Sequence, residues 1–270
     1  PFGSPKVMGF TNMNDMMKDL NKMLSGMGGM GMQSGITQLK LEMHEYKEMG
    51  LSVGDKVFLE EGAKATASIL NATSGPIYLA KNAEIMEGCI VRGGLALGES
   101  SALKMGAKIY GATTLGPHCK VGGEVNNSVI IGYSNKGHDG FLGNSVIGEW
   151  CNLGADTNTS NLKNNYAEVR LWNYESENFA KTGLQFCGLL MGDHSKCGIN
   201  TMFNTGTVVG VSANVFGSGF PRNFIPSFSW GGHSGLSTYL TNKAFEVAQV
   251  VMKRRGEEFT DIDAAILTEV

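Results

Sequence analysis

The sequence is poor in charged residues and has no long apolar run. Charged side chains make up 17% of the 270 residues, against about 25% in a typical globular chain. No run of roughly 18 or more apolar residues occurs, so we expect no membrane-spanning helix. The formal net charge of −3 argues against a nucleic-acid partner, because binding to phosphate backbones needs a basic surface.

The sequence also lacks the paired cysteines of a disulfide framework or zinc finger. Its five cysteines are odd in number and scattered, and no C-x-x-C pair occurs. The first residues, PFGSPKVMGF, lack the basic start and apolar run of a signal peptide. We therefore interpret the cysteines as reduced thiols and expect a cytoplasmic protein.

Glycine and methionine are abundant instead. Glycine occurs 38 times, about twice its usual share. Ten of the 15 methionines precede residue 50, and their spacing predicts an amphipathic helix over 12–24, followed by a flexible Gly/Met tract over 25–35. A Met-rich helix can be a plastic surface for a partner. The favoured interpretation is that it docks on its own domain, because nothing in the sequence indicates a partner.

From residue 77 a six-residue period replaces helical spacing. A period of six fits neither a helix nor a hairpin, but it suits a triangular coil whose sides are short strands, each with a large residue pointing inward. Stacked coils pair such strands in parallel and bury a continuous core. The large positions are Leu79, Ile85, Val91, Leu97, Leu103, Ile109, Leu115 and Val121, and the pattern returns at Ile147, Leu153, Met191, Cys197, Phe203, Val209 and Val215.

Four residues after each large position of the first series lies a mostly small one, which we also place inside. Cys89, Cys119 and Cys151 fall on such positions, so their role is structural. The period breaks at 132–140 and at 162–188, and loops that leave a rigid solenoid often carry function.

The C-terminal part returns to helical spacing. Thr241 is placed to cap a helix that runs through 243–255, and Asp261 to begin a second one. We expect these helices to cover the last open coil, because a solenoid end needs a cap. The predicted organisation is a Met/Gly-rich helical segment over 1–54, the solenoid over 55–228 and a helical cap over 229–270.

The repeat resembles the hexapeptide repeat of acyltransferases. Residues 136–163 also contain a His-x-x-aromatic-x-Gly step, then Ile-Gly, Asn-x-Gly-Ala and a later Asn. This motif is similar to the acetyltransferase domain of the bifunctional glucosamine-1-phosphate acetyltransferase / N-acetylglucosamine-1-phosphate uridyltransferase family, above all to its archaeal and divergent bacterial branches. The resemblance covers about residues 55–256. It implies an all-β fold, a left-handed parallel β-helix with flanking helices at both ends.

The resemblance also implies an activity and a site. The expected reaction is acetyl transfer from acetyl-CoA to the amine of glucosamine-1-phosphate or a similar amino sugar phosphate, in a homotrimer and without a metal. The nucleotidyltransferase half has no counterpart in this chain, so we expect no uridyl transfer from it. The implied residues are His138 as the general base, Phe141, Asn152, Asn161, Arg170, Tyr110 and Asn126 for the acceptor, and Ala155 and Gly217 for acetyl-CoA.

Two of these positions depart from the family. Tyr110 and Asn126 stand where the family has the Arg and Lys that bind the sugar phosphate. Charge-assisted hydrogen bonds are the strong ones, so this loss weakens a phosphate site unless Lys108, Lys120 or Arg170 substitutes. The substitutions leave open an alternative, a catalytically decayed trimerisation or regulatory β-helix of a sugar-1-phosphate nucleotidyltransferase.

Two further interpretations concern single residues. Lys136 could attract a phosphate or CoA, but a surface lysine is the favoured reading. His118, His138 and His194 are the candidates for a zinc site like that of γ-type carbonic anhydrases, which share this solenoid. Their spacing does not reproduce the ligand pattern of those enzymes, so we disfavour this site.

Overall fold

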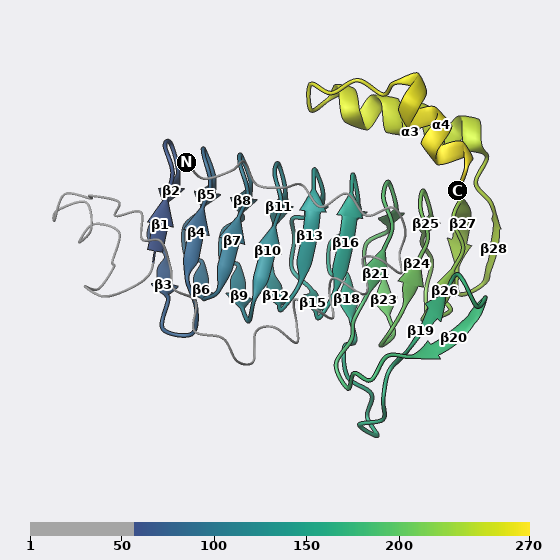
Figure 1. The fold of residues 1–270 in the computed structure, drawn as a ribbon, viewed down its shortest axis with the longest axis horizontal. Helices are drawn as coiled ribbons and strands as arrows, with labels where there is room; N and C mark the ends of the chain where they lie inside the picture. The colour runs from purple at the N-terminus through teal and green to yellow at the C-terminus, as the bar shows by residue number, and fades with distance from the viewer. Residues whose placement is uncertain (1–56) are drawn as a thin grey trace, which may run out of the picture.

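The six-residue period folds into stacked three-sided coils, as predicted (Figure 1). The computed structural model describes residues 57–270, and the predicted helix over 12–24 lies outside them. The fold is a left-handed parallel β-helix with two helices near its C-terminus, which confirms the predicted fold class for this part of the chain.

Two sides of the coil each stack into one sheet, and the third is divided between sheet C and the pair β18–β23. The strands pair in parallel apart from two antiparallel pairs, β27–β28 and β19–β20. Sheet A contains β1 (Val57–Leu59), β4 (Ile77–Leu79), β7 (Leu95–Leu97), β10 (Thr113–Leu115), β13 (Val129–Gly132), β16 (Val146–Glu149), β21 (Leu190–Met191), β24 (Val208–Val209) and β26 (Phe224–Ile225). Sheet B contains β2 (Lys64–Ala65), β5 (Glu84–Ile85), β8 (Ala102–Leu103), β11 (Lys120–Val121), β14 (Asn135–Lys136), β17 (Asn152–Leu153), β22 (Lys196–Cys197), β25 (Asn214–Val215), β27 (Ser229–Gly232) and β28 (Gly235–Thr238). Sheet C contains β3 (Ile69–Asn71), β6 (Ile90–Arg92), β9 (Lys108–Tyr110), β12 (Glu124–Asn126) and β15 (Phe141–Gly143). The strands β18 (Asn158–Thr159) and β23 (Met202–Phe203) form a pair of their own, and β19 (Arg170–Asn173) pairs with β20 (Asn178–Lys181).

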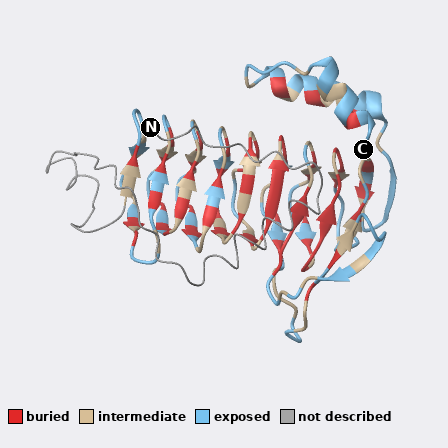
Figure 2. Ribbon diagram, viewed as in Figure 1, coloured by how far each residue is buried: buried red, intermediate tan, exposed pale blue. Residues whose placement is uncertain are grey.

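The core lies inside the coils (Figure 2). Every large position predicted from the period is buried, and so is every small position of the first series, including Ser101 and Thr113. Parallel register explains this, because residues such as Leu79, Leu97 and Leu115 pair directly from coil to coil and stack their side chains. All five cysteines are buried free thiols.

The interruption over 162–188 builds a second, smaller core on the outer face of sheet A. Its hairpin β19–β20 brings Leu171 and Trp172 over the outward residues Leu190 and Val208, which are buried as a result. Trp172 also stacks on Phe224, with ring centroids 4.1 Å apart. The hairpin therefore covers sheet A near the C-terminal end of the solenoid (Figure 1).

The C-terminal helices depart from the expectation. Helix α3 (Thr241–Lys253) is preceded by Leu240 as its N-cap residue, with no side-chain cap, so Thr241 does not cap it. Helix α4 (Asp261–Thr268) begins at Asp261 as predicted, behind a capping box formed by Thr260 and Asp263. Neither helix, among the residues described, is long and apolar enough to cross a bilayer.

Helix α3 runs back along the flank of the solenoid, and α4 returns after a turn toward the C-terminal end, so the pair does not simply cover the last coil (Figure 1). The Arg255 guanidinium donates hydrogen bonds to the His118 carbonyl and to the Asn135 side chain, and the Tyr133 hydroxyl donates to Glu257. The coil stack itself continues through β27, which pairs in parallel with β25. The segment after α3 is therefore held by hydrogen bonds to coils in the middle of the solenoid.

Four aromatic rings form a stack along the corner that joins sheets A and B. Successive centroids of His118, Tyr133, Trp150 and His194 are 4.8, 4.2 and 6.2 Å apart. All four residues have φ between 50° and 59°, so each occupies the same left-handed corner position of its coil. The helical segment docks beside this stack.

His194 predicts a dependence of stability on pH. Burial holds the pKa of its imidazole at about 4, below the ordinary value of 6.5, and Nδ1 has no hydrogen-bond partner within the described residues. In the unfolded chain the His194 imidazole therefore binds a proton near pH 6.5, whereas in the folded protein it binds one only near pH 4. The free energy of unfolding should therefore fall as the pH drops across this window. The slope of this fall against pH corresponds to the uptake of up to about one proton on unfolding. His194→Phe keeps a ring in the stack and should flatten the dependence in urea unfolding series; an unchanged slope would show that other groups cause it.

Candidate functional site

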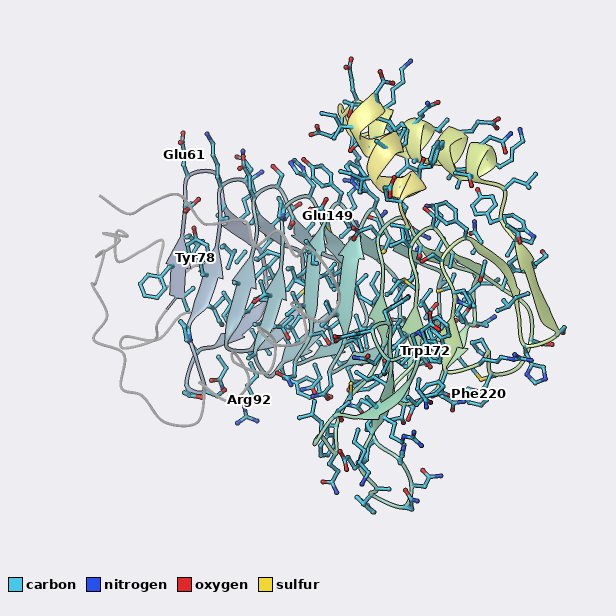
Figure 3. The ribbon with its side chains drawn as sticks, turned by 45° about the vertical axis from the view of Figure 1, so that its right-hand side comes forward. Glu61, Tyr78, Arg92, Glu149, Trp172 and Phe220 are labelled. Carbon is cyan, nitrogen blue, oxygen red and sulfur yellow. The ribbon has the colours of Figure 1, made fainter. Side chains whose placement is uncertain are left out.

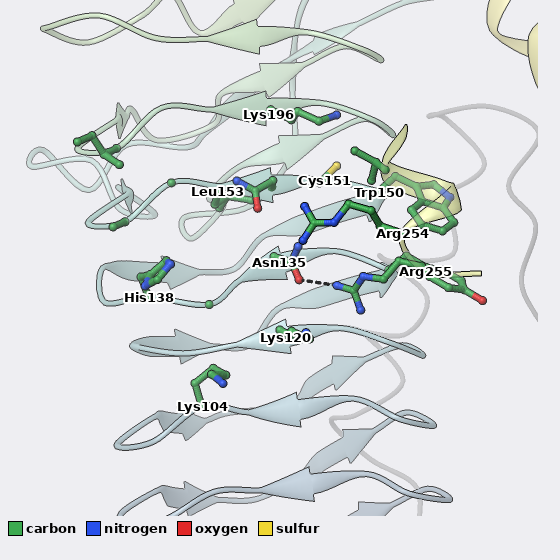
Figure 4. A pocket seen from close by; sticks show the side chains of 17 residues that line it. Lys104, Lys120, Asn135, His138, Trp150, Cys151, Leu153, Lys196, Arg254 and Arg255 are labelled. Carbon is green, nitrogen blue, oxygen red and sulfur yellow. Dashed lines mark hydrogen bonds between the residues drawn. The ribbon is translucent and has the colours of Figure 1, made fainter. Parts of the chain in front are cut away.

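A pocket of about 710 Å³ lies on the outer face of sheet B, under the end of helix α3 (Figure 4). His138 lies at one end of it, and Trp150 lies at the other (Figure 4). The strands β11, β14, β17 and β22 form its floor, since Lys120, Asn135, Asn152 and Lys196 line it. With Lys104, which follows β8, the pocket spans five coils of the solenoid.

The pocket is strongly basic. Its lining residues include five cations and no carboxylate: Lys104, Lys120, Lys196, Arg254 and Arg255. The two arginines follow the last turn of α3, and the hydrogen bond between Arg255 and Asn135 joins them to the floor (Figure 4). Lysine and arginine side chains gathered in one concave surface attract phosphate groups. The arrangement therefore suits a ligand with several phosphates.

The structure brings three of the predicted site residues to this pocket: His138, Asn152 and Ala155. His138 is exposed on the turn between β14 and β15, where sheet B passes to sheet C. Asn152 points outward from β17, and Ala155 lies on the next turn of the same corner, since the Asp156 amide donates to the Asp139 carbonyl. Gly217 lies on this corner two coils further, in the exposed turn after β25, with φ 105°.

A second group lies beside the first on sheet C. Tyr110 and Asn126 are neighbours in register, and the Asn126 amide donates to the Tyr110 carbonyl. Asn161 donates to the Asn144 side chain at 2.7 Å. Phe141 begins β15, directly after the His138 turn. His138 therefore stands between the basic pocket and this outer face of sheet C.

The register of sheet C adds a cation that sequence reasoning missed. Arg92 pairs with Tyr110, so Arg92, Tyr110 and Asn126 form one outward row across three coils. Figure 3 shows Arg92 on the outside of the solenoid. Lys108 lies in the adjacent row and pairs with Glu124, which accepts a hydrogen bond from the Tyr110 hydroxyl. That bond, with burial, raises the pKa of Tyr110 to about 12, so the phenol stays protonated.

Two further basic residues lie away from the pocket surface. Arg170 lies in the hairpin β19–β20, where its guanidinium donates to the Phe179 carbonyl, and it does not line the pocket. Lys136 is not a surface lysine: it is 2% exposed and points into the solenoid. Its register explains this, because Lys136 pairs with the inward residue Val121.

Cys151 and the three histidines His118, His138 and His194 are the candidates for a nucleophile and for zinc ligands, respectively. Cys151 lines the pocket but is 1% exposed, and burial raises the pKa of its thiol, so it is a poor nucleophile. His118 and His194 are separated on the corner stack by Tyr133 and Trp150, and His138 lies at the opposite end of sheet B (Figure 4). In residues 57–270 no group of three or more His, Cys, Asp or Glu side chains could hold a metal ion.

Gly143 permits the arrangement on sheet C. A Cβ atom at this position would lie 2.5 Å from Cζ of Phe141 and 2.7 Å from Nδ2 of Asn161, closer than real contacts allow. For the acetyl transfer that the family resemblance implies, Gly143→Ala should therefore displace both side chains and raise the acceptor KM about tenfold or more, while the KM for acetyl-CoA changes little. Steady-state kinetics test this, with Gly132→Ala, where the nearest atom is a flexible Glu149 carboxylate oxygen, as the control. An unchanged acceptor KM would show that the acceptor does not bind to this part of sheet C.

The fold is a hexapeptide-repeat β-helix that carries a histidine turn beside a basic pocket. No protein-family model matches the chain. It is similar to the bifunctional protein GlmU of Methanocaldococcus jannaschii, with 36% identity over 87 residues, which cover 32% of this chain and 21% of that protein. It is also similar to the bifunctional sugar-1-phosphate nucleotidylyltransferase/acetyltransferase of Sulfurisphaera tokodaii, with 33% identity over 93 residues, or 34% and 23% of the two chains.

These similarities confirm the resemblance to the bifunctional family, and the chain spans about a fifth of the length of these curated relatives. Among solved structures, the polySia-specific acetyltransferase NeuO matches 68% of this chain and 82% of its own, with 12% identity and a TM-score of 0.37.

Proposed function

We propose that this protein transfers an acetyl group from acetyl-CoA to the amino group of glucosamine-1-phosphate or a similar amino sugar phosphate. The observation that carries the proposal is the position of His138, at the end of a pocket lined by five cations and at the edge of sheet C. The names of the relatives, which include an acetyltransferase, agree with it.

The proposed chemistry needs one base and two binding surfaces. The amine nitrogen attacks the thioester carbonyl, a C–N bond forms, and the C–S bond breaks with release of the CoA thiol. His138 takes the proton that the amine loses, as a general base placed beside the acceptor. Backbone amides of the corner turns are suited to stabilise the oxyanion. No acyl-enzyme forms, in agreement with the burial of Cys151.

We place acetyl-CoA along the basic pocket. Its phosphates would pair with lysines of sheet B and with Arg254 and Arg255, and its thioester end would reach the corner of His138 and Ala155. The acceptor would then lie on sheet C, against Phe141 and Asn161, with its phosphate toward Arg92. Arg92, one coil beyond Tyr110, would then supply a cation for this phosphate that Tyr110 and Asn126 do not.

A homotrimer is part of the proposal. The acceptor residues lie on an open outer face, and Ile69 and Ile90 on the same sheet are 62% and 49% exposed. A second copy packed against this face would bury these side chains and enclose the acceptor. Sedimentation equilibrium tests the assembly directly.

The alternative is the decayed β-helix, a scaffold without turnover. The observation in its favour is that Tyr110 and Asn126 bond to neighbouring groups of sheet C and carry no charge for a phosphate. Binding of acetyl-CoA without consumption of any amino sugar phosphate would identify it. Tyr110→Arg combined with Asn126→Lys would then be expected to restore turnover.

The arginines after α3 give a test of the acetyl-CoA site. The double substitution Arg254→Ala with Arg255→Ala removes two of the five pocket cations and should raise the KM for acetyl-CoA about tenfold or more, with kcat little changed. Lys253→Ala is the matched control, because this exposed lysine is adjacent in sequence but does not line the pocket. Equal effects of both changes would show only a loss of overall charge, and the pocket would then lose its assignment.

A further inference from the structure

Lys136 is a lysine inside the solenoid. The inward row of sheet B runs through Ile85, Leu103 and Val121, each fully buried, and Lys136 occupies the next place in that row. A buried charge costs free energy unless it is paired and hydrogen-bonded. The three preceding coils have an apolar residue at the position that Lys136 occupies. The lysine therefore has a role that packing alone does not explain.

Its hydrogen bonds point to the role. The ammonium group donates to the Gly122 carbonyl at 3.0 Å and to the His138 carbonyl at 2.5 Å. Gly122 and His138 lie on successive turns of the corner between sheets B and C. These turns touch, since a Cβ on Gly123, which has φ 70°, would lie 2.8 Å from the His138 carbonyl oxygen. Lys136 thus ties the turn of His138 to the coil before it.

We propose that Lys136 is a positioning residue for His138: from inside the solenoid, its ammonium group fixes the main chain of the turn that presents the imidazole to the acceptor amine. The inference rests on the proposed function, because His138 needs to be positioned only if it acts as the general base. A base must be held within a fraction of an ångström of its working position, and a displacement of about 1 Å can cost about 100-fold in rate.

The charge of Lys136 supports the role. Burial lowers the pKa of its ammonium group to about 8, against the opposing charges of Asp139 and Asp156. Cys197 would add to these charges only as a thiolate, and burial raises the pKa of its thiol. The group is therefore charged at neutral pH, and its bond to the His138 carbonyl is charge-assisted. Above pH 8 it becomes neutral and the tie weakens, so kcat should decline on the alkaline side.

Lys136→Met tests the proposal, because methionine fills the inward position without a donor. We expect kcat for acetyl transfer to glucosamine-1-phosphate to fall about tenfold or more, with the KM for acetyl-CoA within about twofold and without the alkaline decline. The melting temperature should stay the same or rise, since an apolar residue of similar volume often replaces a buried charge without loss of stability. Leu103→Met, in the same row and nearly unchanged in volume, is the control and should leave kcat unchanged.

Hydrogen exchange gives a readout that does not depend on activity. The amides of β15, which follow the turn at the edge of sheet C, should exchange faster in Lys136→Met, while those of β11 and β17 stay protected. Unchanged exchange in β15, full activity of the variant, or a joint fall of activity and melting temperature would each overturn the proposal. Should the parent protein transfer no acetyl group, the proposed function fails, and exchange alone still decides whether Lys136 fixes the turn.

Discussion

Replacement of His138 by alanine is expected to lower the turnover of acetyl transfer by about 100- to 10,000-fold, the usual contribution of a general base. The imidazole lies on an exposed turn, so its removal should leave the fold and the melting temperature unchanged. The affinity for acetyl-CoA should also change little, because the phosphates of CoA would bind to the lysines and arginines of the pocket.

The matched control is His233→Ala. His233 is also an exposed histidine, bonded to the Phe220 carbonyl, and it does not line the pocket. Turnover from thiol release and acetyl-CoA affinity from calorimetry, measured on both variants, separate catalysis from binding. A His138→Ala protein that retains full turnover would remove the assignment of the base and leave only the fold.

Replacement of Ile109 by aspartate is expected to unfold the protein or leave it without a cooperative transition. Ile109 is 1% exposed and points into the coil from β9, as Leu103 does from the preceding side. An unpaired charge in this interior costs several kcal/mol, roughly the stability of a typical domain. Circular dichroism and size-exclusion chromatography of the purified variant check the result.

Met105→Asp is the control for this change. Met105 belongs to the same coil but is 71% exposed, so a charge there stays in water and should leave the melting temperature almost unchanged. A folded Ile109→Asp protein with the stability of the parent would refute the inward register of the coil, and with it the placement of every residue derived from the period.

The six-residue period predicts the core residues from the sequence, but it does not predict the position of every side chain near the site. Inward positions repeat locally, every six residues, so Leu103 and Ile109 could be assigned without a structure. The coils that contain His138 differ in length, since Leu115 pairs with Ile130 and Ile130 with Ile147. The period fails across this change, and Lys136 was therefore placed on the surface although it lies inside.

Contacts between distant residues also have no local signal. Arg92 joins Tyr110 only through the register of sheet C, 18 residues along the chain. Arg255 reaches Asn135 across 120 residues, so its place in the pocket follows from the docking of α3 and not from any motif. The histidine turn itself was accessible because its glycines and aromatic residue form a compact pattern in the sequence.

The most direct test of the account is a thiol-release assay with the purified chain, acetyl-CoA and a panel of amino sugar phosphates, with the products identified by mass spectrometry. The account predicts release of CoA that depends on the acceptor, and an N-acetylated product from glucosamine-1-phosphate or a close relative. Saturable binding of acetyl-CoA with no acetylated product from any acceptor would contradict it.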